Sequence, residues 1–295
     1  MAPPQARLFG NNNDMPVLQH LRSARHFYRR IRAQKHLAGL ADANVPVSAA
    51  IAGAFNSRTS AAERAWIGRI EELRRRMKAS SEVLEITDYS ARSADAKLTE
   101  EEMYRGRVIR RTIGEVYTRT SRTSRYMLLL LRLIRELQPH TCVELGTSLG
   151  ISACYQAAAL KLNGAGKLVT LEGADAVASV AARNFASLGL DVSVVRGRFQ
   201  DTLPEVLSAN APVDYAFIDG HHEERATLKY FNAFLPALSA AAVVVFDDIR
   251  WSEGMQRAWD AIRRHDRVRL SEDLGSMGLI STVGAINPQH FRTAF

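Results

Sequence analysis

The chain contains few cysteines and no long apolar run. Its only two cysteines, Cys142 and Cys154, stand in apolar segments, where a reduced thiol behaves as a small hydrophobic side chain. Near the middle of the chain, the apolar run Met127 to Leu131 continues as Leu133 and Ile134 after Arg132, and it is far shorter than the roughly 20 residues that cross a bilayer. The first twenty residues lack the charged start, apolar centre and cleavage site of a secretory signal. We therefore expect a cytoplasmic protein without membrane association.

Acidic residues are scarce in the first half of the chain. Residues 1–140 contain 25 Lys and Arg against 14 Asp and Glu, whereas residues 141–295 contain 14 against 17. Such asymmetry is found in proteins that bind nucleic acid, an anionic membrane surface or an acidic partner. Here the arginines alternate with carboxylates and lack interleaved aromatic residues on which bases could stack. The pattern favours solvated helix faces over a nucleic-acid site.

No internal repeat or Gly/Pro/Ser-rich linker divides the chain, so its organisation must be taken from periodicity. In the first 120 to 140 residues the patterns predict helices over 20–40, over 98–117 and over 124–138. Another predicted helix starts at a capping box formed by Ser60 and Glu63 and ends before Ser81, and its apolar stripe consists of Trp66, Ile70, Leu73 and Met77. We interpret 1–120 as a helical accessory region that forms a lid or a dimer surface, and 121–295 as the main domain.

From Thr141 onward, short apolar strands alternate with helical segments, which is typical of an α/β doubly wound, mostly parallel sheet. Seven strands are predicted, over 141–146, 167–173, 191–197, 213–220, 241–248, 267–273 and 278–284. Helices are predicted over 151–163, 174–188, 201–209, 224–238 and 252–265.

Ligands of open α/β sheets bind at the carboxyl ends of the strands, so the strand ends are the places to search. The first strand ends in Glu144-Leu145-Gly146-Thr147-Ser148-Leu149-Gly150, an E-x-G-x-x-x-G pattern that leads into a helix. The pattern is neither the G-x-G-x-x-G of dinucleotide sites nor a P-loop, since no Gly-Lys-Ser/Thr follows. Its two glycines allow a tight turn and close approach of a ligand to the backbone. Alone, the turn is weak evidence of binding.

The next two strand ends strengthen the prediction. Glu172 ends the second strand, where an acceptor-only carboxylate can take hydrogen bonds from both hydroxyls of a ribose. The third strand ends at Gly197, followed by Phe199 and Gln200, which offer an aromatic face and an amide for an adenine ring. Three such features at successive strand ends indicate a nucleoside site.

Over about Thr141 to Gly284 these residues resemble the class I S-adenosylmethionine-dependent methyltransferases, and within them the small-molecule O-methyltransferases similar to catechol O-methyltransferase. The resemblance implies a Rossmann-like sheet whose fourth and fifth strands lie beside the first. It further implies S-adenosylmethionine as cofactor. The residues that it places around the cofactor are Glu144, Gly146, Thr147, Ser148, Gly150, Ser152, Glu172, Gly197, Phe199, Gln200 and Asp219.

Three carboxylates stand at the ends of the fourth and fifth predicted strands: Asp219, Asp247 and Asp248. Converging carboxylates repel one another unless they are protonated, paired with cations or bridged by a metal, and oxygen ligands suit Mg²⁺ or a similar hard ion. The metal-dependent relatives have Asp-Asn where this chain has Asp247-Asp248. We therefore expect a divalent cation there, with helix capping or direct substrate binding as the alternative.

Methyl transfer to a hydroxyl at neutral pH requires a base that removes the proton. His222 lies three residues after Asp219, where the catechol enzymes carry a lysine, and histidine titrates near neutral pH. His221 is the rival base, and an exposed or capping pair of histidines is the structural alternative. Trp251 is expected to line the acceptor pocket, whereas Met255 and Trp259 are expected to pack in a helix interface.

The sequence thus predicts a transferase that methylates a hydroxyl of a small-molecule acceptor. An anionic acceptor and a carrier-bound acceptor are both compatible with the basic first half of the chain. N-methylation, RNA methylation and a non-catalytic S-adenosylmethionine-binding protein remain alternatives. RNA is disfavoured, because the chain has no known RNA-binding module and lacks the Asn/Asp-Pro-Pro-Tyr/Phe signature of enzymes that methylate exocyclic base nitrogens. The N-terminal helices are expected to cover the cofactor or to form a homodimer.

Overall fold

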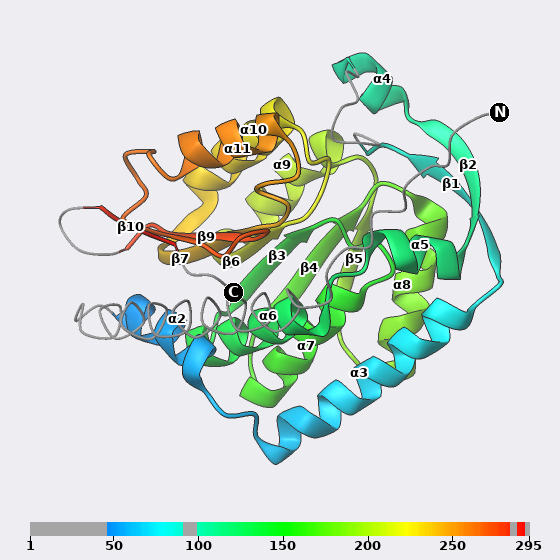
Figure 1. Ribbon diagram of the computed structural model, residues 1–295, viewed down its shortest axis with the longest axis horizontal. Coiled ribbons are helices and arrows are strands. Elements are labelled where there is room, and N and C mark those ends of the chain that lie inside the picture. The colour runs from blue at the N-terminus through cyan, green and yellow to red at the C-terminus, as the bar shows by residue number, and fades with distance from the viewer. Residues whose placement is uncertain (1–45, 91–98, 284–287, 293–295) are drawn as a thin grey trace, which may run out of the picture.

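A central eight-stranded sheet organises the computed structural model of the chain, which describes residues 46–90, 99–283 and 288–292 (Figure 1). Its strands are β3 (Thr141–Leu145), β4 (Lys167–Glu172), β5 (Ser193–Arg196), β6 (Val213–Ile218), β7 (Leu238–Phe246), β8 (Leu270–Asp273), β9 (Gly278–Ser281) and β10 (Gln289–Arg292). Their order across the sheet is β10-β8-β9-β7-β6-β3-β4-β5, and all neighbours are parallel except those of β9. The predicted doubly wound sheet is confirmed, with β6 and β7 following β3 as expected. The sequence missed β10, which pairs with β8 and makes the sheet eight-stranded rather than seven-stranded.

Helices cover both faces of this sheet, so the domain has three layers (Figure 1). One face carries α2 (Pro46–Asn56), α3 (Ala61–Ala79), α6 (Ser124–Leu137), α7 (Ile151–Asn163) and α8 (Asp175–Leu188). The other carries α9 (Phe199–Asn210), α10 (Glu224–Phe234), the short 3₁₀ turn η1 (Leu235–Ala237) and α11 (Glu253–Ile262). The central strands are apolar on both sides because both faces are covered, and every residue of β3 is buried.

The predicted helix starts and stripes agree with this arrangement. Ser60 and Glu63 form the expected capping box at the start of α3, with Ser60 N donating to Glu63 Oε2 at 2.7 Å and Glu63 N donating to Ser60 Oγ at 3.2 Å. Ile70 and Leu73 are buried against α7, and the predicted core role of Met255 and Trp259 is confirmed, as both are buried in α11. None of the described helices is long and apolar enough to cross a membrane.

The region before β3 is less helical than predicted. Residues 98–117 do not form one helix: α4 (Glu100–Arg105) stops at Gly106, whose φ of 65° favours glycine, and the chain continues as β2 (Arg107–Thr112) and then α5 (Ile113–Thr120). β2 pairs antiparallel with β1 (Val83–Asp88), a strand that the sequence analysis did not predict. The β-branched residues of both segments favour this pairing over helix. The helix predicted over 20–40 lies outside the described residues.

The β1–β2 ribbon lies apart from the main sheet, beside the carboxyl ends of β3, β4 and β5 (Figure 1). Leu84 and Ile86 of β1 pack on Ala174 and Val177 at the start of α8, and this satellite cluster also takes in Val116 of α5. The first part of the chain therefore forms a wall over the strand ends, where the sequence analysis predicts the ligand site.

Candidate functional site

A cavity of about 610 Å³ lies between the strand ends and the β1–β2 ribbon, within the range of about 300–1,000 Å³ that is usual for small-molecule sites. The predicted site residues that line it are Gly146, Ser148, Glu172, Phe199, Gln200, Asp219, His221, His222 and Asp248. Trp251 also lines it, as expected, with its ring centroid 5.8 Å from that of His222. The predicted residues Glu144, Thr147, Gly150, Ser152, Gly197 and Asp247 are not among its lining residues.

The turn after β3 places two glycines where side chains would collide. Gly146 has φ 97°, and a Cβ added to it would lie 1.8 Å from the carbonyl oxygen of Asp219. Gly150, with φ 80°, begins α7 and leaves room for the ring of Phe185, which would lie 2.7 Å from an added Cβ. The turn can therefore pack against the end of β6 at Gly146 and against α8 at Gly150 only because both positions lack a side chain.

Glu144 is buried behind this turn. Its carboxylate accepts hydrogen bonds from Gln156 Nε2 at 2.7 Å and from Thr170 Oγ1 at 2.6 Å, and Thr170 Oγ1 lies 2.7 Å from Thr147 Oγ1. Burial raises the pKa of Glu144 to about 7, against the hydrogen bonds from Ser152, Thr170 and Gln156 that favour its ionised form. Glu144, Thr147 and Ser152 thus form a polar support under the turn rather than a lining of the cavity.

Glu172 faces the cavity from the end of β4. Its Oε2 accepts from the backbone N–H of Ser148 at 2.8 Å and its Oε1 from that of Ala174 at 2.9 Å. Each carboxylate oxygen retains a second lone pair for a ligand hydroxyl. Burial nevertheless raises the pKa of Glu172 above its ordinary value. The two backbone bonds hold this carboxylate in one orientation.

The third strand end forms the neighbouring wall of the cavity. Phe199, the first residue of α9, meets the rings of His221 and Tyr230 edge-on, at centroid distances of 5.6 and 5.8 Å. Gln200 also lines the cavity, while Gly197, with φ 134°, makes the turn between β5 and α9. Phe199 and Gln200, the two residues that we expect to contact an adenine ring, are therefore neighbours in this wall of the cavity.

The two histidines after β6 have different surroundings, although both adopt the left-handed backbone region. His221 Nδ1 is 2.6 Å from the hydroxyl of Tyr230, and burial lowers the pKa of His221 to about 4. His222 Nε2 points between two carboxylates, 3.5 Å from Asp219 Oδ1 and 3.9 Å from Asp248 Oδ2. Burial lowers the pKa of His222 more than the neighbouring carboxylates raise it. Both rings are therefore neutral at pH 7, and His222 has the acidic neighbours that would stabilise an acquired proton.

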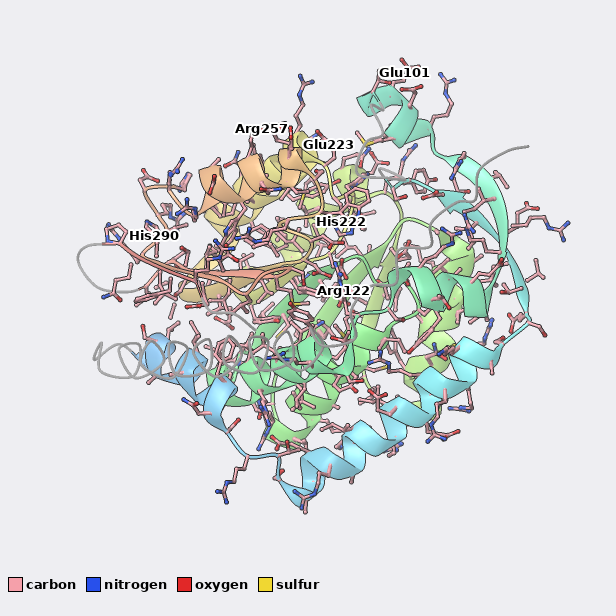
Figure 2. All side chains as sticks on the ribbon, in the orientation of Figure 1. Glu101, Arg122, His222, Glu223, Arg257 and His290 are labelled. Carbon is pink, nitrogen blue, oxygen red and sulfur yellow. The ribbon has the colours of Figure 1, made fainter. Side chains whose placement is uncertain are left out.

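Arg122 lies among the predicted metal ligands, and the sequence analysis gave it no role there. It comes from the connection between α5 and α6, and Figure 2 shows it near His222 at the centre of the molecule. Its Nε donates to Asp247 Oδ2 at 2.5 Å, and its Nη2 pairs with Asp248 Oδ1. Burial opposes the charge of Arg122, but the attraction of Asp247 and Asp248 outweighs burial and raises its pKa, so the guanidinium is a permanent cation.

The three aspartates, as arranged, do not fit a divalent metal. Asp247 has no exposed side-chain surface, and both its oxygens are used, because Oδ1 accepts from the backbone N–H of Asp248 at 2.8 Å. A divalent ion about 4 Å from the guanidinium would be repelled by about 8 kcal/mol at an effective dielectric constant near 20. Burial and repulsion from Asp247 also raise the pKa of Asp219 well above its ordinary value, which favours its protonated form. No metal-binding group of three or more His, Cys, Asp or Glu occurs in the described ranges, and the predicted metal site is not confirmed.

The connection that carries Arg122 is anchored by a second buried arginine. Arg74 of α3 donates from Nη2 to the carbonyl oxygen of Arg122 at 2.6 Å and from Nε to the hydroxyl of Tyr117 at 3.1 Å. Sequence reasoning treated both arginines as members of solvated helix faces. Apart from Glu71, which lies three residues before Arg74, the partners named here lie 43 to 125 residues away in the chain, so a local pattern does not mark these contacts.

Further arginines of the first half reach the cavity. Arg107 and Arg111 of β2 and Arg119 of α5 line it, together with Asp88 and Tyr89. Arg107 Nε lies 3.6 Å from Asp88 Oδ2, whereas Arg111 and Arg119 attract Glu115 electrostatically but make no direct hydrogen bond or close ion pair with any residue that the structure describes. The wall opposite the strand ends is therefore basic.

Several solved structures resemble this chain. An O-methyltransferase from Bacillus cereus in complex with SAH is 23% identical, with 55% of this chain and 83% of that chain covered at a TM-score of 0.47. The O-methyltransferase TomG from Streptomyces achromogenes, involved in tomaymycin synthesis and solved with SAM, is 25% identical, with 56% and 82% covered at a TM-score of 0.48. A search of curated proteins finds no match.

Independently of these structures, residues 143–249 match a family model described as a methyltransferase domain. The matched segment begins in β3 and ends just after β7, so it contains the turn after β3, Glu172, both histidines and all three aspartates. Its strands have the order that the sequence analysis expected for the class I methyltransferase fold. This part of the chain therefore matches a methyltransferase domain, and the predicted enzyme class is confirmed.

Proposed function

We propose that the protein transfers a methyl group from S-adenosylmethionine to a hydroxyl of a small acceptor that carries negative charge. One observation carries the proposal: a single cavity brings the turn after β3 and Glu172 together with His222, Asp219 and a basic wall. The family match supports methyl transfer.

The cofactor part of the cavity is assigned to the first three strand ends. Glu172 would accept the ribose hydroxyls with its remaining lone pairs, and Phe199 and Gln200 would contact the adenine ring. Gly146 and Ser148 of the turn after β3 line the cavity and would contact the methionine part. When bound, the cofactor supplies a methyl group on a positively charged sulfur.

The acceptor part is assigned to the ends of β6 and β7. His222 is neutral and would accept the proton of the acceptor hydroxyl. The acceptor oxygen would form a bond to the methyl carbon as the carbon–sulfur bond breaks, and the electron pair of the broken bond would stay on sulfur. The imidazolium formed lies 3.9 Å from Asp248 Oδ2, and the negative charge of Asp248 stabilises it. His221 is a poorer base, because its Nδ1 is engaged by Tyr230 and its pKa is about 4.

The charge of the acceptor is inferred from the basic wall. Arg111 and Arg119 line the cavity without a hydrogen-bonding or ion-pairing partner among the described residues. Both arginines attract Glu115 electrostatically, and guanidinium groups that line a cavity suit a carboxylate or a phosphate, which they bind with two hydrogen bonds each. The predicted homodimer stays a prediction.

Calorimetry with S-adenosylhomocysteine tests the cofactor assignment. We expect binding to the purified protein, and a Glu172→Ala variant that binds at least about tenfold more weakly, because one hydrogen bond to a charged group contributes about 1.5–3 kcal/mol. Glu205→Ala, in α9 and outside the cavity lining, is the matched control and should bind normally. Absence of binding heat with the unmodified protein would rule the cofactor out.

A screen with methyl-labelled cofactor tests the acceptor. Anionic phenols and hydroxy acids should be labelled, and neutral analogues should be labelled less. Labelling of RNA instead, with the steep salt dependence of nucleic-acid binding, would overturn the small-molecule assignment. Label transferred to amines but not to hydroxyls would overturn O-methylation.

A further inference from the structure

We propose that Arg122 is the built-in cation of the acceptor site: it neutralises Asp247 and Asp248 and donates a hydrogen bond to the acceptor oxygen, in the place where the sequence predicted a divalent metal. The inference rests on the proposed methyl transfer and names a residue from outside the matched domain that completes the site.

The contacts of Arg122 are those of a resident cation. Two of its three guanidinium nitrogens bind the two aspartates that follow β7, through Nε to Asp247 and Nη2 to Asp248. Asp247 is fully buried and Asp248 mostly so, which means that their charges have to be compensated inside the protein. A fork that contacts both carboxylates achieves this with fixed geometry.

The third guanidinium nitrogen is free to act on a ligand. Nη1 of Arg122 makes no hydrogen bond within the part of the chain that the structure describes, and the residue lines the cavity. The side chain of Arg122 is 27% exposed and lies beside His222 and Asp248. An acceptor oxygen next to His222 would therefore meet a donor that favours its developing negative charge as the proton leaves.

The position of Arg122 is prepared before a ligand binds. Arg74 is itself buried and holds the carbonyl oxygen of Arg122, so the connection between α5 and α6 is tied to α3. A donor fixed in this way needs no reorganisation when the acceptor oxygen becomes charged. Arg74 is a positioning residue in this scheme.

Metal uptake provides a test that does not depend on turnover. Electron paramagnetic resonance of added Mn²⁺ should show only free ion with the unmodified protein. Arg122→Ala should bind one Mn²⁺, because Asp247 and Asp248 lose their cation while their oxygens remain. Arg110→Ala removes the same charge from an exposed site on β2 that does not line the cavity, and it should leave Mn²⁺ free.

Turnover and cofactor affinity complete the test. EDTA should leave the methyl transfer of the unmodified protein unchanged, and Arg122→Ala should lose about 100-fold or more in turnover, as expected for the loss of a donor to a developing oxyanion. Arg122→Lys keeps the charge and should exclude Mn²⁺, which preserves the test if the alanine variant does not fold.

Three outcomes would overturn the proposal: stoichiometric Mn²⁺ binding by the unmodified protein that Asp247→Asn abolishes, turnover that EDTA inhibits, or no Mn²⁺ uptake by folded Arg122→Ala. Calorimetry with S-adenosylhomocysteine on every variant separates this proposal from the proposed function. Failure of the unmodified protein to bind S-adenosylhomocysteine would refute the cofactor assignment, whereas the Mn²⁺ experiment reports on Arg122 alone.

Discussion

Glu144 is a carboxyl group without exposed surface, and it makes stability depend on pH. Its pKa of about 7 in the folded protein lies above its ordinary value of 4.5, so the folded state holds the proton more tightly than the unfolded state. The contribution of Glu144 to the free energy of unfolding should therefore fall by up to about 3 kcal/mol as the pH rises from about 4.5 to about 7, and it should stay level above pH 7.

Glu144→Gln should remove most of this pH dependence and raise the stability at pH 8. The glutamine can donate to Thr170 and accept from Gln156, so the buried polar contacts are kept without a charge. Urea unfolding at pH 5 and pH 8 measures the effect. Equal pH dependence in the two proteins would show that Glu144 is ionised throughout.

The two histidines offer a comparison between neighbouring residues. His222→Asn should lower turnover by about 100-fold or more while leaving S-adenosylhomocysteine affinity within about threefold, because general-base catalysis contributes about 10²–10⁴. His221→Asn loses a contact to Tyr230 and should cost stability more than turnover. Steady-state kinetics with calorimetry distinguish the two, and the reverse order of effects would make His221 the base.

At the scale of elements, the turn between β3 and α7 is limited by space rather than by backbone conformation alone. Gly146 and Gly164 both have positive φ, but a Cβ at Gly146 would overlap the Asp219 carbonyl whereas nothing lies within 4 Å of one at Gly164. The turn and the end of β6 must therefore separate if Gly146 acquires a side chain.

Gly146→Ala should abolish measurable nucleoside binding and destabilise the fold by several times the effect of Gly164→Ala, which should cost about 1 kcal/mol for its left-handed backbone alone. Thermal unfolding and calorimetry of the two variants check this. Normal nucleoside binding by Gly146→Ala would mean that the turn does not form part of the site.

At the scale of the whole molecule, the first half of the chain closes a site built by the second half. The β1–β2 ribbon contributes Ile86, Asp88, Arg107 and Arg111 to the cavity, yet it pairs with no strand of the main sheet. An antiparallel pair held by one satellite cluster opens more easily than the central strands.

S-adenosylhomocysteine should therefore slow amide hydrogen exchange in β1 and β2 by about tenfold or more, since a ligand held between ribbon and sheet stabilises the closed form. Strands β8 and β10, on the far side of the sheet, serve as the internal control and should change little. Unchanged exchange in the ribbon despite nucleoside binding would show that it takes no part in holding the ligand.

The sequence by itself determined the βαβ part and the residues at its strand ends. Apolar runs, the glycines of the turn after β3 and the carboxylates at the ends of β4, β6 and β7 are local signals. They identify a site because parallel strands present their carboxyl ends at one edge of a sheet. The match over residues 143–249 lies within this part.

Only the tertiary structure decided what surrounds those strand ends. The pairing of β1 with β2 depends on contacts with α8 and α5, and helical propensity alone misplaced residues 98–117. Arg122 meets Asp247 across 125 residues of chain, so its spacing on a helix-rich segment could not distinguish a solvated arginine from a buried counter-ion. The sequence could therefore show that three carboxylates stand at neighbouring strand ends, but only the fold shows that an arginine from the first half of the chain pairs with two of them.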